Sequence, residues 1–317
     1  MFNAELLAKS KKGQIIINAA RGGLVDEQAL ADAIKAGQIR GAGFDVYSKE
    51  PCTDSPLFEL DEVVVTPHLG ASTVEAQDRA GTDVAASVLK ALAGDFVPDA
   101  VNVTGGKVSE EVALWLNLAT TLGKVSSALL DAPVTAVTVE ARGELSTESV
   151  DALGLAALRG IFDGVVDEQV TFVNTPQIAE DRGVDLTVST ADESVTHRSV
   201  LEVRAVAGDG TSVSVIGALT GLDHVEKIVR INDRGLDLRA GGLNLFLTYT
   251  DQPGALGTVG TFLGREGINI NAAALSQNLD DESATLVLRV DKEISADLVA
   301  QVKDALSASH AVQLNLG

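Results

Sequence analysis

The sequence is poor in cysteine and in aromatic residues. Cys52 is the one cysteine among 317 residues, which rules out an intrachain disulfide and suits a reducing compartment. It follows Pro51 in a polar loop without a clear partner, so we interpret it as incidental rather than as a nucleophile. Aromatic residues make up 3% of the chain and hydrophobic residues 45%. The cores must therefore be aliphatic, and the length suits two or three domains.

Long apolar runs are missing as well. No stretch approaches the length of a membrane span, and the first residues contain no apolar core of a signal peptide. We therefore expect a cytoplasmic protein that has no membrane partner.

Positive charge is also scarce. Lys and Arg number 24 against 45 Asp and Glu, which gives a formal net charge of -21 spread along the chain. Such a surface repels phosphate backbones and anionic membranes, so nucleic acid is excluded as a partner. A small anionic ligand would need local Arg or Lys residues to outweigh this overall field. No metal site is predicted.

The first quarter of the chain has an α/β pattern. Residues 15–17 are a continuous run of isoleucine, which predicts a strand buried on both faces. The other elements expected here are strands at 41–46 and 63–65 and helices over 26–36 and 71–92. Strands that alternate with helices are typical of a parallel sheet. Residues 1–98 are therefore predicted to be part of a Rossmann-like domain.

This predicted sheet is small. It has about three strands, whereas an open parallel sheet usually has five or more. No G-x-G-x-x-G run follows a strand in the sequence, although such a run supplies the helix N-terminus that holds a pyrophosphate. We therefore expect strands upstream of Met1 in a longer parent, of which this chain is a C-terminal fragment.

A loop at residues 98–107 leads into a second region, 108–240, with an α+β pattern. A helix is predicted over 109–128, and a short helix is predicted to open at Thr175 as its N-cap. Strands are expected at 134–139, 186–189, 200–207 and 212–219, with a hairpin turn at 208–210. The region is predicted to be a separate α+β domain.

The last region, 243–317, has another order of elements. Strands are expected at 243–250, 268–276, 284–290 and 312–316, and helices over 254–264 and 296–306. The order β-α-β-β-α-β is that of a ferredoxin-like sandwich. We predict that these residues form the third domain.

Three polar residues stand just after the predicted strands of the first region, namely Arg21, Glu50 and His68. Ligands bind at this edge of open parallel sheets. A guanidinium can hold a carboxylate with two parallel hydrogen bonds, an imidazole can take a hydroxyl proton, and a nearby carboxylate favours the protonated imidazole. The three types together suit the oxidation of a 2-hydroxy acid. Each residue alone also fits an ordinary loop or turn, and only the joint placement favours a site.

Three motifs around these residues resemble those of the NAD-dependent D-2-hydroxyacid dehydrogenases. Residues 17–27 (INAARGGLVDE) resemble the arginine motif of that family. Residues 43–51 (GFDVYSKEP) resemble its aspartate-glutamate motif, and residues 66–72 (TPHLGAS) resemble its histidine motif. The order of the three matches along the chain is also that of the family.

This resemblance implies a role for each matching residue. Arg21 would bind the carboxylate of the substrate, and His68, paired with Glu50, would be the acid and base. Asp45 would contact the carboxamide of the nicotinamide ring of NAD. The remaining contacts to that ring would come from residues next to the motif centres, namely Ala19, Ala20, Gly70 and Ala71.

The last region resembles an ACT domain, a small-molecule sensor of amino-acid enzymes. The similarity lies in residues 247–257 (LTYTDQPGALG) and 267–270 (GINI). It implies that Tyr249, Asp251 and Asn269 bind L-serine between subunits. Asp-Gln-Pro-Gly is also an ordinary turn and helix start, which is the simpler interpretation of these residues taken alone.

The middle region resembles the intervening domain of the long-form phosphoglycerate dehydrogenases. The similarity is clearest in residues 224–231 (HVEKIVRI) and 237–239 (DLR). It implies an anion effector site, for which Lys227, Arg239 and Arg289 are the candidates. Ordinary surface charge explains these residues equally well.

Taken together, the resemblances imply an enzyme of L-serine biosynthesis that oxidises 3-phospho-D-glycerate to 3-phosphohydroxypyruvate with NAD. They imply regulation by serine and a homo-oligomer, a tetramer in this family. Two alternatives stay open from the sequence. The chain as given can be a catalytically inert regulatory and assembly module that binds L-serine. It can also come from another 2-hydroxyacid dehydrogenase, such as a glycerate or lactate enzyme, although the long sensor-bearing tail weakens this reading.

Overall fold

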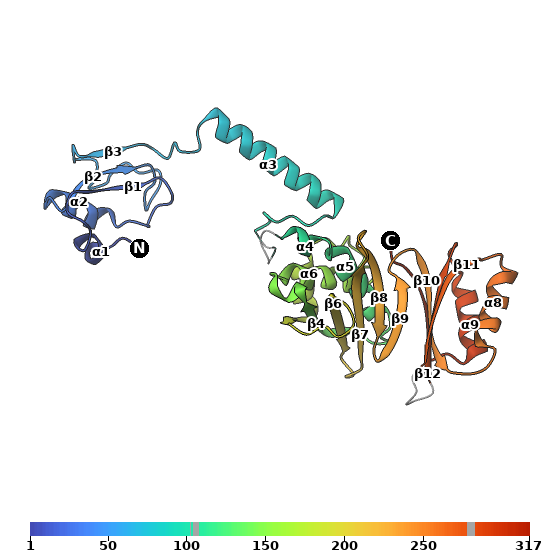
Figure 1. Ribbon diagram of the computed structural model, residues 1–317. Coiled ribbons are helices and arrows are strands. Elements are labelled where there is room, and N and C mark those ends of the chain that lie inside the picture. The colour runs from blue at the N-terminus through green and yellow to red at the C-terminus, as the bar shows by residue number, and fades with distance from the viewer. Residues whose placement is uncertain (102, 104–107, 278–282) are drawn as a thin grey trace. The chain divides into compact units, whose positions relative to one another are not determined.

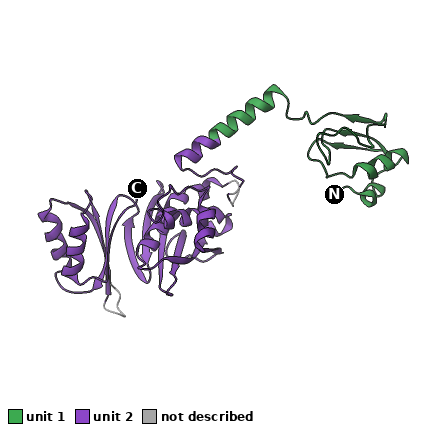
Figure 2. Cartoon of the chain, turned by 180° about the vertical axis from the view of Figure 1, so that it is seen from behind, with its two compact units in different colours: residues 1–86 green, residues 87–317 purple. Residues whose placement is uncertain are grey.

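The computed structural model describes residues 1–101, 103, 108–277 and 283–317. The chain forms two compact units, residues 1–86 and 87–317, shown in green and purple in Figure 2. In the described residues no helix is long and apolar enough to cross a membrane. Part of the predicted loop at 98–107, namely residues 102 and 104–107, lies outside the described residues.

The first unit contains a parallel three-stranded sheet. Its strands are β1 (Gln14–Asn18), β2 (Ile39–Phe44) and β3 (Val63–Val65), in that order across the sheet (Figure 1). Two helices, α1 (Ala4–Ala8) and α2 (Glu27–Lys35), belong to this unit. The three predicted strands and the parallel arrangement are confirmed, although β2 begins and ends two residues earlier than expected.

Helix α2 shows why this segment folds as it does. The Asp26 side chain accepts a hydrogen bond from the amide of Ala29, as an N-cap residue does. Leu30, Ala31 and Ile34 follow at helical spacing and are buried in the core of the unit. Ile16 of β1 and Phe44 of β2 belong to the same core.

The prediction that β1 is buried on both faces is wrong. Ile16 is buried, but Ile15 is 47% exposed and Ile17 is 76% exposed. Val64 of β3 is 73% exposed. Side chains alternate between the two faces of a strand, so these residues share the face that the described core of this unit does not cover. An isoleucine run predicts burial on both faces only where both faces have a covering layer.

Helix α3 (Val74–Ala93) runs from the first unit into the second. None of its residues is buried. The predicted long helix is confirmed, three residues later at its start than expected.

The second unit begins with an α+β region built on a six-stranded sheet of order β5-β4-β6-β7-β8-β9. Its strands are β4 (Val134–Gly143), β5 (Asp185–Ala191), β6 (Ser199–Ala207), β7 (Ser212–Thr220), β8 (Val225–Ile231) and β9 (Arg234–Arg239). Its helices are α4 (Glu110–Ala113), α5 (Leu116–Ala128), the 3-10 turn η1 (Glu144–Thr147), α6 (Asp151–Phe162) and α7 (Thr175–Arg182). All neighbouring strands are antiparallel except the parallel pair β4 and β5.

Two predictions for this region need correction, and several of its elements were not predicted, among them α6, β8 and β9. The helix expected over 109–128 is divided at Leu114 and Trp115 into α4 and α5. The N-cap of α7 is Asn174 and not Thr175, whose hydroxyl donates backwards to the carbonyl of Thr171 at 2.6 Å. Helix α6 was not predicted, because ten of its twelve residues are buried and a helix that is apolar almost all round shows little amphipathic period.

Helices α5 and α6 approach each other closely through two glycines. A Cβ atom at Gly123 would stand 2.1 Å from the carbonyl oxygen of Ala157, and one at Gly160 would stand 1.9 Å from that of Thr120. Both positions therefore require glycine. The helices pack on the sheet around a core that includes Trp115, which is 2% exposed.

The last region is a four-stranded antiparallel sheet of order β11-β12-β10-β13. The strands are β10 (Leu243–Thr250), β11 (Ile270–Gln277), β12 (Ser283–Val290) and β13 (His310–Asn315), and the helices are α8 (Ala255–Arg265) and α9 (Ala296–Leu306). Both helices lie on one face (Figure 1). The predicted ferredoxin-like order is confirmed.

Candidate active site

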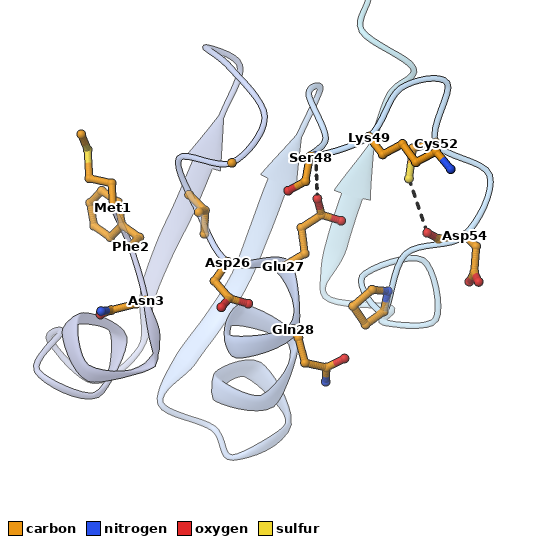
Figure 3. Close-up of a pocket in the computed structure, with 13 residues that line it drawn as sticks. Met1, Phe2, Asn3, Asp26, Glu27, Gln28, Ser48, Lys49, Cys52 and Asp54 are labelled. Atoms are coloured by element: carbon orange, nitrogen blue, oxygen red, sulfur yellow. Dashed lines mark hydrogen bonds between the residues drawn. The ribbon is translucent and has the colours of Figure 1, made fainter.

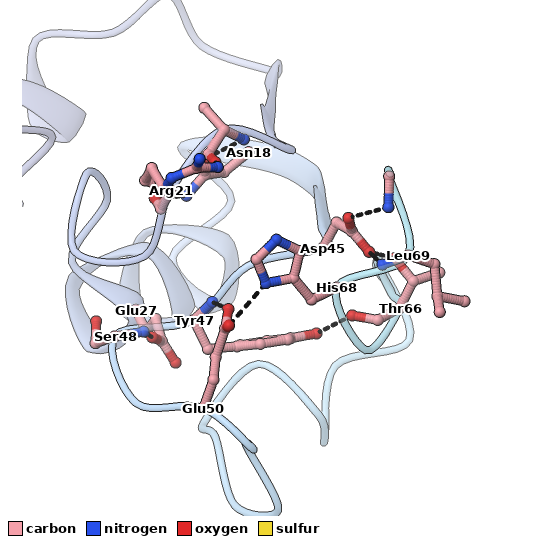
Figure 4. A network of polar contacts seen from close by, with 12 residues as sticks. Asn18, Arg21, Glu27, Asp45, Tyr47, Ser48, Glu50, Thr66, His68 and Leu69 are labelled. Atoms are coloured by element: carbon pink, nitrogen blue, oxygen red, sulfur yellow. Dashed lines mark hydrogen bonds and ion pairs between the residues drawn. The ribbon is translucent and has the colours of Figure 1, made fainter. Parts of the chain in front are cut away.

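The loops that follow β1, β2 and β3 carry Arg21, Glu50 and His68. Because the three strands are parallel, their carboxyl ends share one edge of the sheet. Figure 4 shows the side chains of these loops together with Asp45 and Tyr47 at that edge. Each residue therefore stands where the sequence predicts it.

Glu50 and His68 are in contact. The Oε2 atom of Glu50 lies 2.7 Å from Nδ1 of His68, and the two side chains are 34% and 44% exposed. The hydrogen bond from His68 is the main reason why the pKa of Glu50 is lower than its ordinary value, and the amide of Tyr47 adds to the effect. The structure thus brings together the carboxylate and the imidazole that the chemistry requires.

Arg21 has a different environment. Its Nη1 donates to the carbonyl of the preceding Ala20 at 2.8 Å, and the side chain lies in an exposed loop. Asn18 fixes this loop, because its amide group donates to the Arg21 carbonyl and accepts from the Ala20 amide. Within the described residues no hydrogen bond or ion pair joins Arg21 to Glu50 or His68. The Ala20 carbonyl takes one of the five N–H donors of this guanidinium, and the other donors can still bind a carboxylate.

Asp45 anchors the loop that contains His68. Its Oδ1 accepts from the Thr66 hydroxyl and from the amide of Leu69, both at 2.6 Å, and Oδ2 accepts from the amide of Gly70 at 2.8 Å. These bonds, with that from Thr66 the largest, lower the pKa of Asp45. Asp45 is 8% exposed. The carboxylate therefore serves first as a structural acceptor in this loop.

Tyr47 connects the loops to one another. Its backbone amide donates to Oε1 of Glu50 at 2.9 Å, and its hydroxyl donates to the carbonyl of Thr66 at 3.1 Å. A Cβ atom at Gly22 would stand 1.8 Å from the carbonyl oxygen of Tyr47. The side chain is buried, which raises the pKa of its phenol, and its ring packs edge-on against Phe58.

Glu27 holds the glutamate loop from the other side. Its carboxylate accepts from the amide of Ser48 at 2.9 Å and from the hydroxyl of Ser55 at 2.7 Å. It also lines a cavity of about 620 Å³, drawn in Figure 3, which includes Cys52 but none of Arg21, Glu50 and His68. From the sequence Glu27 appears only as an acidic residue in the first turn of a helix, and no local pattern reveals its long-range partners.

The chain is similar to known proteins along its whole length. Residues 1–70 match the NAD binding domain of D-isomer specific 2-hydroxyacid dehydrogenases, residues 111–232 the intervening domain of D-3-phosphoglycerate dehydrogenase, and residues 244–307 the ACT domain. The D-3-phosphoglycerate dehydrogenase of Mycobacterium leprae is 56% identical, with 100% of this chain and 60% of that protein covered. By sequence, the chain is therefore similar to the D-3-phosphoglycerate dehydrogenases along its whole length, and its three regions match three domain families of such enzymes.

The similarity extends to relatives in other organisms. The D-3-phosphoglycerate dehydrogenase of Methanocaldococcus jannaschii is 32% identical over 100% of this chain and 60% of that protein. The chain thus spans about 60% of the length of the curated relatives that it matches. Among solved structures, a D-isomer specific 2-hydroxyacid dehydrogenase from Xanthobacter autotrophicus Py2 is 39% identical over 30% of this chain and 39% of that chain, at a TM-score of 0.28.

The candidate effector residues of the ACT domain fall at two opposite ends of β12 within one chain. Tyr249 and Asp251 stand at the end of β10, where Thr250 pairs with Ser283 at the start of β12. Asn269 precedes β11. Its backbone amide donates to the carboxylate of Asp291, which lies just beyond the other end of β12. β12 is eight residues long, so its two ends lie roughly 23 Å apart. Tyr249 is 3% exposed and packs in the domain core.

The candidate anion ligands of the intervening domain lie near its junction with the ACT domain. Lys227 stands opposite Arg239 across the β8–β9 pair and forms an ion pair with Asp237 at 2.6 Å. Arg289 of β12 donates to the carbonyls of Arg239 at 2.9 Å and of Gly241 at 2.6 Å. The structure thus groups the three cations in one area, where a carboxylate and backbone carbonyls already neutralise or bind two of them.

Proposed function

We propose that this chain carries the acid/base and sensing parts of an NAD-dependent phosphoglycerate dehydrogenase of L-serine biosynthesis. The contact of 2.7 Å between Glu50 and His68, at the carboxyl edge of a parallel sheet, is the observation that supports the proposal most directly. The reaction would oxidise 3-phospho-D-glycerate to 3-phosphohydroxypyruvate.

The geometry suggests which nitrogen of His68 exchanges the proton. Nδ1 faces the Glu50 carboxylate, so its hydrogen is donated there and the lone pair of Nε2 is left to accept the proton of the substrate hydroxyl. Glu50 then stabilises the imidazolium that forms. In the reverse direction the same imidazolium returns the proton to the carbonyl oxygen. Arg21 would hold the substrate carboxylate with its guanidinium.

The same edge offers a place for the nicotinamide of NAD, which accepts the hydride when bound. A carboxylate has about four positions at which it can accept a hydrogen bond. In Asp45, three of these positions are occupied by donors of the His68 loop. One position on Oδ2 is therefore left for the amide group of a nicotinamide. The neighbouring residues proposed to line the ring are exposed at this edge, namely Ala19, Ala20, Gly70 and Ala71.

The ACT domain supports regulation by an amino acid, for which we propose L-serine. Since Asp251 and Asn269 lie at opposite ends of β12, one serine site would combine Asp251 of one copy with Asn269 of a second. The proposed protein is thus a homo-oligomer, a tetramer by its family, and we place it in the cytoplasm. The cluster of Lys227, Arg239 and Arg289 is the proposed anion effector site.

Reduction of 3-phosphohydroxypyruvate by NADH, together with NAD binding by calorimetry, tests the enzymatic proposal. We expect turnover to depend on His68 and Glu50, with His68→Gln and Glu50→Gln each reducing it by about 100-fold or more. Cys52→Ser serves as the control and should leave the rate unchanged. The alternative is a regulatory and assembly module that binds L-serine without turnover. Serine binding in the absence of both NAD binding and turnover would establish that alternative for this chain.

A further inference from the structure

All three polar groups of Thr66 are bound. Its amide donates to the carbonyl of Phe44 at 2.9 Å, its carbonyl accepts from the Tyr47 hydroxyl at 3.1 Å, and its hydroxyl donates to Asp45 at 2.6 Å. Thr66 stands two residues before His68. Because all three groups are hydrogen-bonded, the backbone of Thr66 has little conformational freedom. The direction in which the chain continues toward His68 is therefore fixed.

His68 has a backbone conformation that needs such support. Its φ angle is +58°, in the left-handed region that residues with a Cβ atom rarely adopt. The anchor points lie on both sides of it, since Asp45 accepts from Thr66 before His68 and from Leu69 and Gly70 after it. One carboxylate thus closes the loop around His68 (Figure 4).

We infer that Thr66 is a positioning residue for the acid/base pair: its hydroxyl, through Asp45, keeps the His68 loop in the left-handed conformation that sets the imidazole on Glu50. The inference rests on the proposed function, because it assigns Thr66 a task in that same site. Thr66 itself does not touch the reacting atoms. The Tyr47 hydroxyl adds a second tether from the loop that also holds Glu50.

The test measures the Glu50–His68 contact directly and needs no turnover. The full chain is labelled with ¹³C at the glutamate carboxylates, and the titration of Glu50 is followed by NMR, with Glu50→Gln identifying its signal. The variants are Thr66→Val, which keeps the shape and removes the hydroxyl, and Thr66→Ser, which restores it. His68→Gln gives the titration of Glu50 without its imidazole partner.

The chain offers a matched control in Thr211. Its hydroxyl donates to Oδ1 of Asp209 at 2.6 Å, the same kind of bond at the same length, in the second unit. Thr211→Val should leave the Glu50 titration where it is in the wild type. It should raise only the pKa of Asp209, which this hydroxyl lowers.

In the wild type we expect Glu50 to titrate below its ordinary range and in His68→Gln close to it. Thr66→Val should move the titration of Glu50 most of the way to that of His68→Gln, while Thr66→Ser should remain with the wild type. If Glu50 titrates in Thr66→Val as it does in the wild type, the positioning role is overturned. Thr66→Ala also removes the hydroxyl and replaces the valine variant in this test if that variant does not fold. If His68→Gln itself leaves Glu50 unchanged, the acid/base pair fails, and with it the proposed function.

Discussion

Gly22 lies directly against the backbone carbonyl of Tyr47, so closely that a Cβ atom at residue 22 would stand 1.8 Å from the oxygen. This contact joins the loop of Arg21 to the loop of Glu50. The Tyr47 hydroxyl in turn reaches Thr66, which leads into His68. Tyr47 therefore connects the three loops that carry the candidate site.

The close contact predicts a large effect of one methyl group. Gly22→Ala should destabilise the first unit by about 1–3 kcal/mol, because the loops must separate to admit the Cβ atom. Urea unfolding followed by circular dichroism would measure it. Gly43→Ala is the control, since a Cβ atom there meets only the Ile17 side chain at 3.8 Å. Equal stability of Gly22→Ala and wild type would contradict the close packing of these loops.

The Tyr47 hydroxyl should contribute less than the glycine contact. Tyr47→Phe removes its bonds to Thr66 and Phe44 and keeps the ring between its aromatic neighbours. We expect a loss of about 1 kcal/mol in the free energy of unfolding, together with an unsatisfied Thr66 carbonyl. Tyr249→Phe, which removes a phenol hydroxyl from the ACT domain, is the control and should leave the unfolding transition of the first unit unchanged. An equal shift of that transition in both variants would argue against a local role of the Tyr47 hydroxyl.

Acid should weaken the first unit in a defined pH range. The pKa values of Glu50 and Asp45 are lowered in the folded protein. Both carboxylates therefore stabilise the fold fully above their unfolded values, roughly 4, and this stability is lost as the pH falls through the lower folded values. Thermal unfolding between pH 7 and pH 3 would show it. Glu50→Gln should have a lower midpoint at pH 7 and a shallower dependence on pH, whereas a parallel curve would contradict the assignment.

The proposed serine site predicts complementation between two variants. Calorimetry with L-serine should show binding by the wild type and none by Asp251→Ala or Asn269→Ala alone. Because the two residues would come from different copies, dissociating and mixing the two variants should restore binding in mixed oligomers. One site of each mixed pair then contains both native residues, and the other contains neither. Binding that survives in either single variant would remove that residue from the site.

Much of the fold was predictable because it depends on local pattern. The split order of the ACT domain follows from strands and helices whose apolar periods are clear, and β10 and α9 occur at the predicted residues. The positions of the candidate site residues were predictable as well, since Arg21, Glu50 and His68 each follow a strand. The boundaries of β2 and the division of the helix at Leu114 were not, because tertiary packing decides where an element ends.

The sequence by itself determined the chemistry that is available: a guanidinium, a carboxylate and an imidazole after successive strands, with a match to the ACT domain further along. Only the tertiary structure decided how these groups are held. The bonds of Asp45 to Thr66, Leu69 and Gly70, of the Tyr47 hydroxyl to Thr66 and of Glu27 to Ser48 and Ser55 join residues 19 to 28 positions apart. No period or spacing encodes such partners, since they depend on which strands lie side by side and on how their loops pack.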